Sequence, residues 1–126
     1  MGTEWVSATM AANKKIVDAY FRSTGTDYAQ LLADDVELID WANGVPASGV
    51  ITRGKTAFVQ NRGRREYRTE LIRMTEEGNV VVVEGTAHGT KKEGGNWTVH
   101  FCDTFEIKEG KVRRISSFGV DVKDSE

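Results

Sequence analysis

Residues 97–108, with the sequence WTVHFCDTFEIK, alternate between two kinds of side chain. One set is apolar except for a single acid and comprises Trp97, Val99, Phe101, Asp103, Phe105 and Ile107. Successive side chains of a β-strand point to opposite faces of the sheet, so this pattern predicts a strand whose apolar set faces the core. Asp103 then lies among apolar side chains, where a carboxylate has to be paired or protonated.

Three further strand-like runs surround this stretch, at residues 66–74, 80–90 and 112–122. The short connectors between the four runs are rich in Gly, Asn, Lys and Glu, as hairpin turns are. We therefore expect an antiparallel meander. An earlier strand is expected at residues 36–41, before the breakers Asn43-Gly44, Pro46 and Gly49.

Helical patterns precede most of the strands. Residues 8–23 carry apolar side chains at helical spacing, a short second helix is expected from Asp27, and residues 55–62 form a third helix ended by Gly63. Helices followed by strands favour an α+β fold. We expect one domain over residues 1–126, a cone-shaped roll of three N-terminal helices packed on a curved, mostly antiparallel sheet that encloses a cavity.

Composition excludes several classes of protein. The 126 residues suffice for one domain, and 39% hydrophobic with 29% charged residues is ordinary for a globular chain. A net charge of −2 gives no bulk attraction to nucleic acid or to an anionic membrane, and neither a membrane span nor a leader pattern is seen. The single cysteine, Cys102, excludes a cysteine-based metal site. We expect a cytoplasmic protein with no metal and no cofactor.

Three polar residues stand out as candidates for chemistry, each with a structural alternative. Asp103 is the strongest, because desolvation should raise its pKa until it is neutral near neutral pH. Asp40 ends a strand on a partly apolar face, although a carboxylate there can also be a solvated turn former. Tyr20 lies on the apolar face of the first helix, where it can equally be a core aromatic.

Three segments that contain these residues resemble one protein superfamily. Residues 17–21 (VDAYF), 31–40 (LLADDVELID) and 101–105 (FCDTF) are similar to ketosteroid isomerases of the nuclear-transport-factor-2-like superfamily. Residues 54–58 and 110–115 are typical of its SnoaL-like polyketide cyclases. The resemblance implies that Asp40 is the base and that Tyr20 and a protonated Asp103 are oxyanion donors. It also implies a homodimer formed by contact between sheets.

The resulting functional expectation is an enzyme that transfers a proton next to a carbonyl, of the isomerase or polyketide cyclase type, acting on a small apolar or carbonyl-containing ligand. The residues expected to bind that substrate are Trp41, Phe58, His88, Phe101, Phe105 and Phe118. The alternative is a non-catalytic ligand-binding or scaffold protein of the same fold. Epoxide hydrolysis, which needs an arginine between two acids, ranks lower because no arginine shares the inward face of Asp103.

Other motifs are given structural interpretations. Residues 49–56, GVITRGKT, satisfy the phosphate-loop pattern but lack the buried strand that should precede it, so we expect an ordinary loop before a helix. The cluster Arg62, Arg64, Arg65 and Arg68 is expected to be a solvated helix end and edge strand rather than a nucleic-acid patch. His88 either lines the cavity as an acid or base or is a hydrogen-bonded histidine of the sheet.

Overall fold

The structure is a computed structural model that describes residues 2–123, with side chains from Ala12 onward. Its elements in chain order are α1 (Gly2–Arg22), the 3-10 helix η1 (Asp27–Leu31), β1 (Leu32–Trp41), β2 (Val50–Arg53), α2 (Lys55–Arg62), β3 (Arg68–Glu77), β4 (Val80–Thr90), β5 (Asn96–Lys108) and β6 (Lys111–Asp121). The class is α+β, as predicted.

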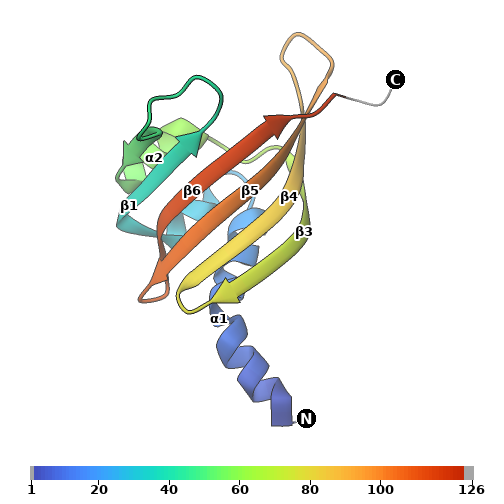
Figure 1. Ribbon diagram of the computed structural model, residues 1–126. Coiled ribbons are helices and arrows are strands. Elements are labelled where there is room, and N and C mark those ends of the chain that lie inside the picture. The colour runs from blue at the N-terminus through green and yellow to red at the C-terminus, as the bar shows by residue number, and fades with distance from the viewer. Residues whose placement is uncertain (1, 124–126) are drawn as a thin grey trace.

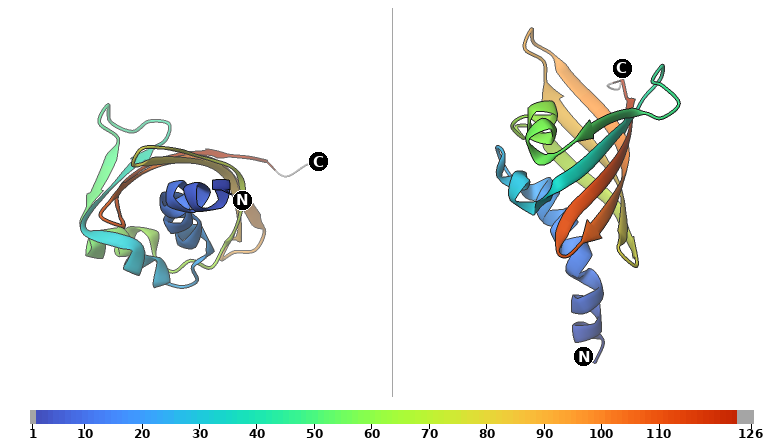
Figure 2. Two further views of the ribbon diagram at one scale, coloured as in Figure 1. Left: turned by 90° about the horizontal axis from the view of Figure 1, so that it is seen from below. Right: turned by 90° about the vertical axis from the view of Figure 1, so that its left-hand side faces the viewer.

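The six strands form one curved sheet that does not close, in the order β2-β1-β6-β5-β4-β3. All neighbours are antiparallel except β1 and β6, which run parallel (Figure 1). Seen end-on, the sheet curls around α1, whose first turns extend beyond the sheet (Figure 2). The concave face therefore holds the helix along part of its length and leaves the rest of that face for a pocket.

The curvature has identifiable causes in the backbone. Register shifts interrupt the pairing of β1 with β6, of β3 with β4 and of β5 with β6. Such irregularities bend a strand and increase its local twist. Exposed Ile72 lies at the shift in β3, where the apolar face of the strand would otherwise continue.

Two glycines of β4 allow aromatic rings of β5 to cross the concave face closely. Gly85 pairs with Phe101, and Gly89 pairs with Trp97. A Cβ added to Gly85 would lie 2.7 Å from the Phe101 ring, and one added to Gly89 would lie 2.3 Å from the Trp97 ring. Only glycine leaves this space, so the two rings cover the backbone of β4 and form one wall of the concave face.

The core forms where α1, η1 and α2 meet the concave face of the sheet. Its fully buried side chains include Val17, Tyr28, Phe58, Leu38 and Phe105. The predicted inward set of β5 faces this core, with Trp97 and Val99 partly buried and the rest buried. No helix in residues 2–123 has the length and apolar character needed to cross a bilayer.

The structure corrects the expected helices and adds a strand. In place of three N-terminal helices it has two α-helices and the 3-10 turn η1, and α2 lies between β2 and β3 rather than before the sheet. The short segment at residues 27–31 makes only a 3-10 turn because β1 begins at once after it. Strand β2 was not predicted, since four residues cannot show a clear alternation.

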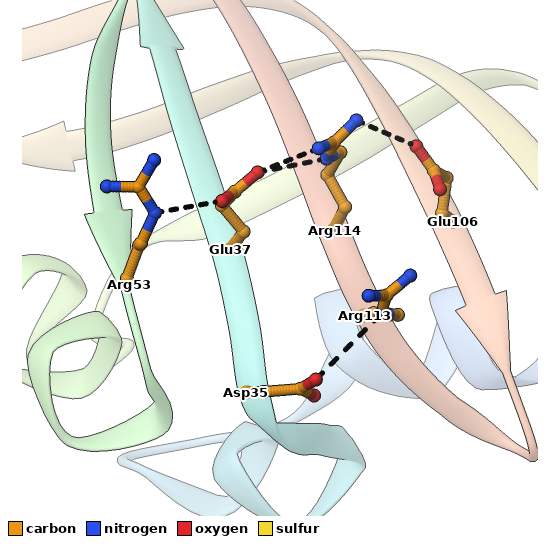
Figure 3. A network of polar contacts seen from close by, with 6 residues as sticks. All are labelled: Asp35, Glu37, Arg53, Glu106, Arg113 and Arg114. Atoms are coloured by element: carbon orange, nitrogen blue, oxygen red, sulfur yellow. Dashed lines mark hydrogen bonds and ion pairs between the residues drawn. The ribbon is translucent and has the colours of Figure 1, made fainter.

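The convex face of the sheet carries a ladder of ion pairs across four strands (Figure 3). Arg53 of β2 binds Glu37 of β1, Glu37 binds Arg114 of β6, and Arg114 reaches Glu106 of β5. Partial burial raises the pKa of Glu37, but hydrogen bonds from Arg114 and Arg53 outweigh this effect and lower the pKa below its usual value. This part of the outer face is therefore ionic.

Candidate functional site

A pocket of about 320 Å³ opens on the concave face, between α1, the segment after α2 and the strands β3 to β6. Its lining residues are Tyr20, Phe21, Arg62, Arg65, Tyr67, Thr69, Ala87, Trp97, Val99, Phe101, Asp103 and Ser117. Most of these side chains are apolar or aromatic, and the few polar groups are ionisable or hydroxyl groups. The pocket is open to the surface rather than the enclosed cavity that was expected. This composition is usual for a small-molecule site.

Asp103 is the buried acid of the pocket. It is 8% exposed, and its Oδ1 atom has no hydrogen-bond partner in the described protein. Burial raises the pKa of Asp103 to about 6, against the lowering effects of a hydrogen bond with Ser117 and of the charges of Arg62 and Arg65. The direction agrees with the prediction, while the hydrogen bond with Ser117 and the two arginines limit the rise in the pKa of Asp103.

Asp40 reaches the pocket through an arginine. Nη2 of Arg62 lies 2.8 Å from Oδ1 of Asp40, and Nη1 lies 3.5 Å from Oδ2. Burial alone would lower the pKa of Arg62, but the hydrogen bond with Asp40 outweighs it and raises the pKa. The ion pair holds Arg62 in the pocket that Asp103 also lines. The positive charge of Arg62 lowers the pKa of Asp103.

Tyr20 stands in the centre of an aromatic cluster. Its ring makes edge contacts with Phe21, Tyr28, Phe58 and Phe105, at centroid distances of 5.1, 5.8, 6.4 and 5.3 Å. Burial raises the pKa of the Tyr20 hydroxyl further above its usual value, so this group stays protonated. Tyr20 is thus both a core aromatic and a hydrogen-bond donor that lines the pocket.

The predicted site residues divide between three environments. Tyr20, Asp103 and Phe101 line the pocket, and Asp40 is tied to it by Arg62. Phe58 and Phe105 are fully buried core residues next to Tyr20 rather than lining residues. The three catalytic candidates lie on the concave side of the sheet, but only Tyr20 and Asp103 line the pocket itself.

The other three predicted binding residues do not line this pocket. His88 lies on the convex face, where Nε2 is 2.9 Å from Oε1 of Glu70. Trp41 and Phe118 stack on each other at 5.9 Å, with an interplanar angle of 7°. Strand alternation places His88 on the convex face, because residues 84, 86 and 88 of β4 lie on the same side of the sheet. The expectation that His88 lines the cavity is corrected; it is a hydrogen-bonded histidine of the sheet.

Sequence reasoning missed the two arginines of the pocket, although signals for them exist. Arg62 follows Phe58 by four residues, which places both on one face of α2. Residues 64–69 alternate, with Arg65, Tyr67 and Thr69 inward and the intervening residues exposed. Arg64 and Arg68 pair with acids at the surface, as a solvated cluster should. Half of the arginine cluster thus belongs to the pocket.

The phosphate-loop pattern has no structural counterpart. Residues 50–53 form an antiparallel edge strand, and Lys55 Nζ lies 3.5 Å from Oδ1 of Asp34. The segment is therefore not a phosphate loop, but the expected ordinary loop is corrected, because residues 50–53 form a strand before the helix. Among the side chains described, those of residues 12–123, no three of the types His, Cys, Asp and Glu gather into a set that could hold a metal ion.

Comparison with known families identifies the class of this protein. The SnoaL-like domain matches residues 14–115, which is most of the chain. The chain belongs to the SnoaL-like domain family, in agreement with the resemblance seen in the sequence. A comparison with curated protein sequences found no match to this chain.

Solved structures agree on the fold. A phenazine biosynthesis-related protein from Pseudomonas aeruginosa superposes with a TM-score of 0.74 at 22% identity, covering 95% of this chain and 82% of that one. A protein assigned as a SnoaL-like polyketide cyclase from Jannaschia sp. CCS1 gives 0.72 at 15% identity, over 87% and 86%. TerC, co-crystallised with polyporic acid, gives 0.67 at 20% identity, over 84% and 89%. At these identities the likeness shows the nuclear-transport-factor-2-like fold alone.

Proposed function

We propose that the pocket catalyses proton transfer next to a carbonyl group, as in an isomerase or a polyketide cyclase. The observation that carries this proposal is the buried carboxyl of Asp103, which has an unpartnered oxygen in the pocket. A general base works best when its pKa lies near the working pH, and the pKa of Asp103 is raised to about 6. Asp103 takes the α-proton, and the electron pair of the C–H bond passes into the enolate.

Two groups in the pocket can stabilise the enolate oxygen. Tyr20 offers a hydroxyl that burial keeps protonated, and Arg62 offers a cation. Asp40 acts here as a positioning residue, because its carboxylate is engaged by Arg62. These roles reverse the ones that the resemblance implied, in which Asp40 was the base and Asp103 the donor. The physical reason is that Arg62 engages the carboxylate of Asp40, whereas Oδ1 of Asp103 has no partner in the described protein and burial raises the pKa of Asp103.

The test is deuterium exchange at the α-carbon of 2-tetralone and ethyl acetoacetate in D₂O, followed by proton NMR. The protein should accelerate exchange, and Asp103→Asn should lower the accelerated rate by about a hundredfold or more, the usual contribution of a general base. Glu93→Gln, in the exposed turn between β4 and β5, is the matched control and should leave the rate unchanged. Equal rates for wild type and Asp103→Asn would remove Asp103 from the mechanism.

Epoxide hydrolysis is a second candidate, favoured by one observation. Arg62 of α2 pairs with Asp40 and lines the pocket together with Asp103, although no arginine was expected on the inward face of the strand. One acid could activate a water while Arg62 and the other acid hold and protonate the epoxide oxygen. Turnover of styrene oxide in ¹⁸O-labelled water, with loss in both Asp40→Asn and Asp103→Asn, would select this reaction. If ligands bind and neither reaction occurs, the protein is a binding protein of this fold.

We also propose a homodimer that buries the apolar part of the convex face. Phe118 is 47% exposed and Val120 is 67% exposed, and Trp41 stacks on the former. These side chains lie at the far end of the sheet from the ionic ladder, so one face offers both an apolar and a charged contact region. Exposed apolar residues grouped in this way are typical of interfaces.

A further inference from the structure

Arg65 is a buried cation that lines the pocket without an acidic partner. The side chain belongs to a residue only 7% exposed, and its Nε atom is buried with no hydrogen bond. Its Nη1 atom donates a hydrogen bond to the hydroxyl of Tyr67, at 2.9 Å. Among the side chains of residues 12–123, no acid forms an ion pair with Arg65, whereas Arg62 in the same pocket has Asp40. Removing a cation from water without a counter-charge is costly, so this placement needs a reason.

The aromatic rings around Arg65 explain part of its position, but they give its Nε atom no hydrogen-bond partner. Its guanidinium carbon lies 4.6 Å from the ring centre of Tyr20, 5.4 Å from that of Tyr28 and 5.3 Å from that of Tyr67. Such cation–π contacts hold the group through its charge, whereas hydrogen bonds are donated in the plane of the guanidinium. The rings therefore stabilise the cation without accepting a hydrogen bond from Nε. A guanidinium held in this way can still bind a planar anion.

We propose that Arg65 binds the carboxylate of an aromatic or conjugated ring acid, whose ring packs against Trp97 and Phe101. The inference deepens the proposed function, since it assigns a substrate class to the same pocket. A carboxylate matches the planar fork of the guanidinium and neutralises its single charge. The volume of about 320 Å³ is at the small end of the range for ligand sites, which fits a compact ring compound.

The placement of charge in the pocket agrees with such a ligand. Asp103 and Arg65 influence each other electrostatically but are not in contact. A ring acid held at Arg65 by its carboxylate can present another carbon of the ring system to Asp103. The carboxylate of the ligand then contributes binding and orientation, while Asp103 and Arg62 remain available for the proton transfer.

The experiment compares two probes of equal size, 2-naphthoate and the uncharged 2-naphthamide, by isothermal titration calorimetry. Wild type should bind 2-naphthoate at least about tenfold more tightly than the amide, the effect expected of one charge-assisted pair. Arg65→Met should weaken 2-naphthoate at least about tenfold and change 2-naphthamide less than about threefold. Arg64→Met removes the exposed neighbour of the same type and should change neither probe.

Several results would overturn the proposal: equal binding of the two probes by wild type, equal losses of both probes in Arg65→Met, or a loss of 2-naphthoate binding in Arg64→Met as large as that in Arg65→Met. If Arg65→Met does not fold, Arg65→Lys serves instead, because it keeps the charge and loses the fork. It should weaken the binding of 2-naphthoate at least about threefold and leave the binding of the amide unchanged, and unchanged binding of 2-naphthoate would contradict the proposal.

Failure of deuterium exchange with selective 2-naphthoate binding would refute the catalytic proposal alone. Exchange without that selectivity would refute this inference alone.

Discussion

Replacing Asp103 by Asn should stabilise the protein in a pH-dependent way. The folded protein raises the pKa of this carboxyl from 3.8 to about 6, so it retains a proton that the unfolded chain releases. Each pKa unit corresponds to about 1.4 kcal/mol, which gives a cost of about 3 kcal/mol when the carboxyl is fully ionised. Stability is lost as pH rises from about 4 through about 6, and the loss is complete above that value. Asn cannot ionise and avoids this loss.

The assay is urea unfolding of wild type and Asp103→Asn at intervals from pH 4 to pH 8.5, with tryptophan fluorescence as the signal. The difference in free energy of unfolding should be near its minimum at pH 4 and should grow by about 3 kcal/mol by pH 7 to 8. Glu93→Gln, at an exposed turn, should show no comparable growth. A difference that stays constant across the range would refute the argument, and carbon-13 titration of Asp103 would show the cause.

Three other predictions concern packing, charge and assembly. Gly89→Ala should lower the free energy of unfolding by about 1–3 kcal/mol through overpacking against Trp97. Gly119→Ala should lower it less, because its added Cβ would lie 3.2 Å from the nearest side-chain atom. Thermal melting compares the two variants. Glu37→Gln should lower the free energy of unfolding by about 1 kcal/mol in dilute salt and by less in 1 M NaCl, because it weakens the ladder of ion pairs on the convex face. A loss of stability that does not change with salt would contradict this prediction. Light scattering should give the mass of two chains for wild type and of one for Phe118→Glu, and a wild-type monomer at micromolar concentration would rule out the dimer.

The sequence predicted the parts of the fold that depend on local periodicity. Alternation in residues 97–108 placed Asp103 on the concave face, because a strand in a hairpin cannot turn one residue over without disturbing its neighbours. The helix at residues 55–62 was likewise predicted with the bounds that the structure shows. Both signals are contained within a single element.

The arginines of the pocket depended on contacts between distant elements. Four arginines within seven residues look like a solvated surface by composition, and only the rings of Tyr20 and Tyr28 show why Arg65 turns inward. The pairing of Arg62 with Asp40 joins residues that are 22 positions apart, which no local pattern reveals. The raised pKa of Asp103 was predicted from its own strand, but the lowering effects of Ser117 and the two arginines come from other elements and were not.

The parallel pairing of β1 with β6 has a consequence for biosynthesis. The partners along this seam are remote in the chain, as Glu37 and Arg114 show with a separation of 77 positions. During translation, one edge of β1 stays unpaired until residues 111–121 leave the ribosome, and only then can Ser117 pair opposite Asp103. A nascent chain stalled before that point would expose two unpaired strand edges, at β1 and at β5, and would be prone to aggregate. The pocket on the concave face is therefore completed by the last strand of this sheet to be made.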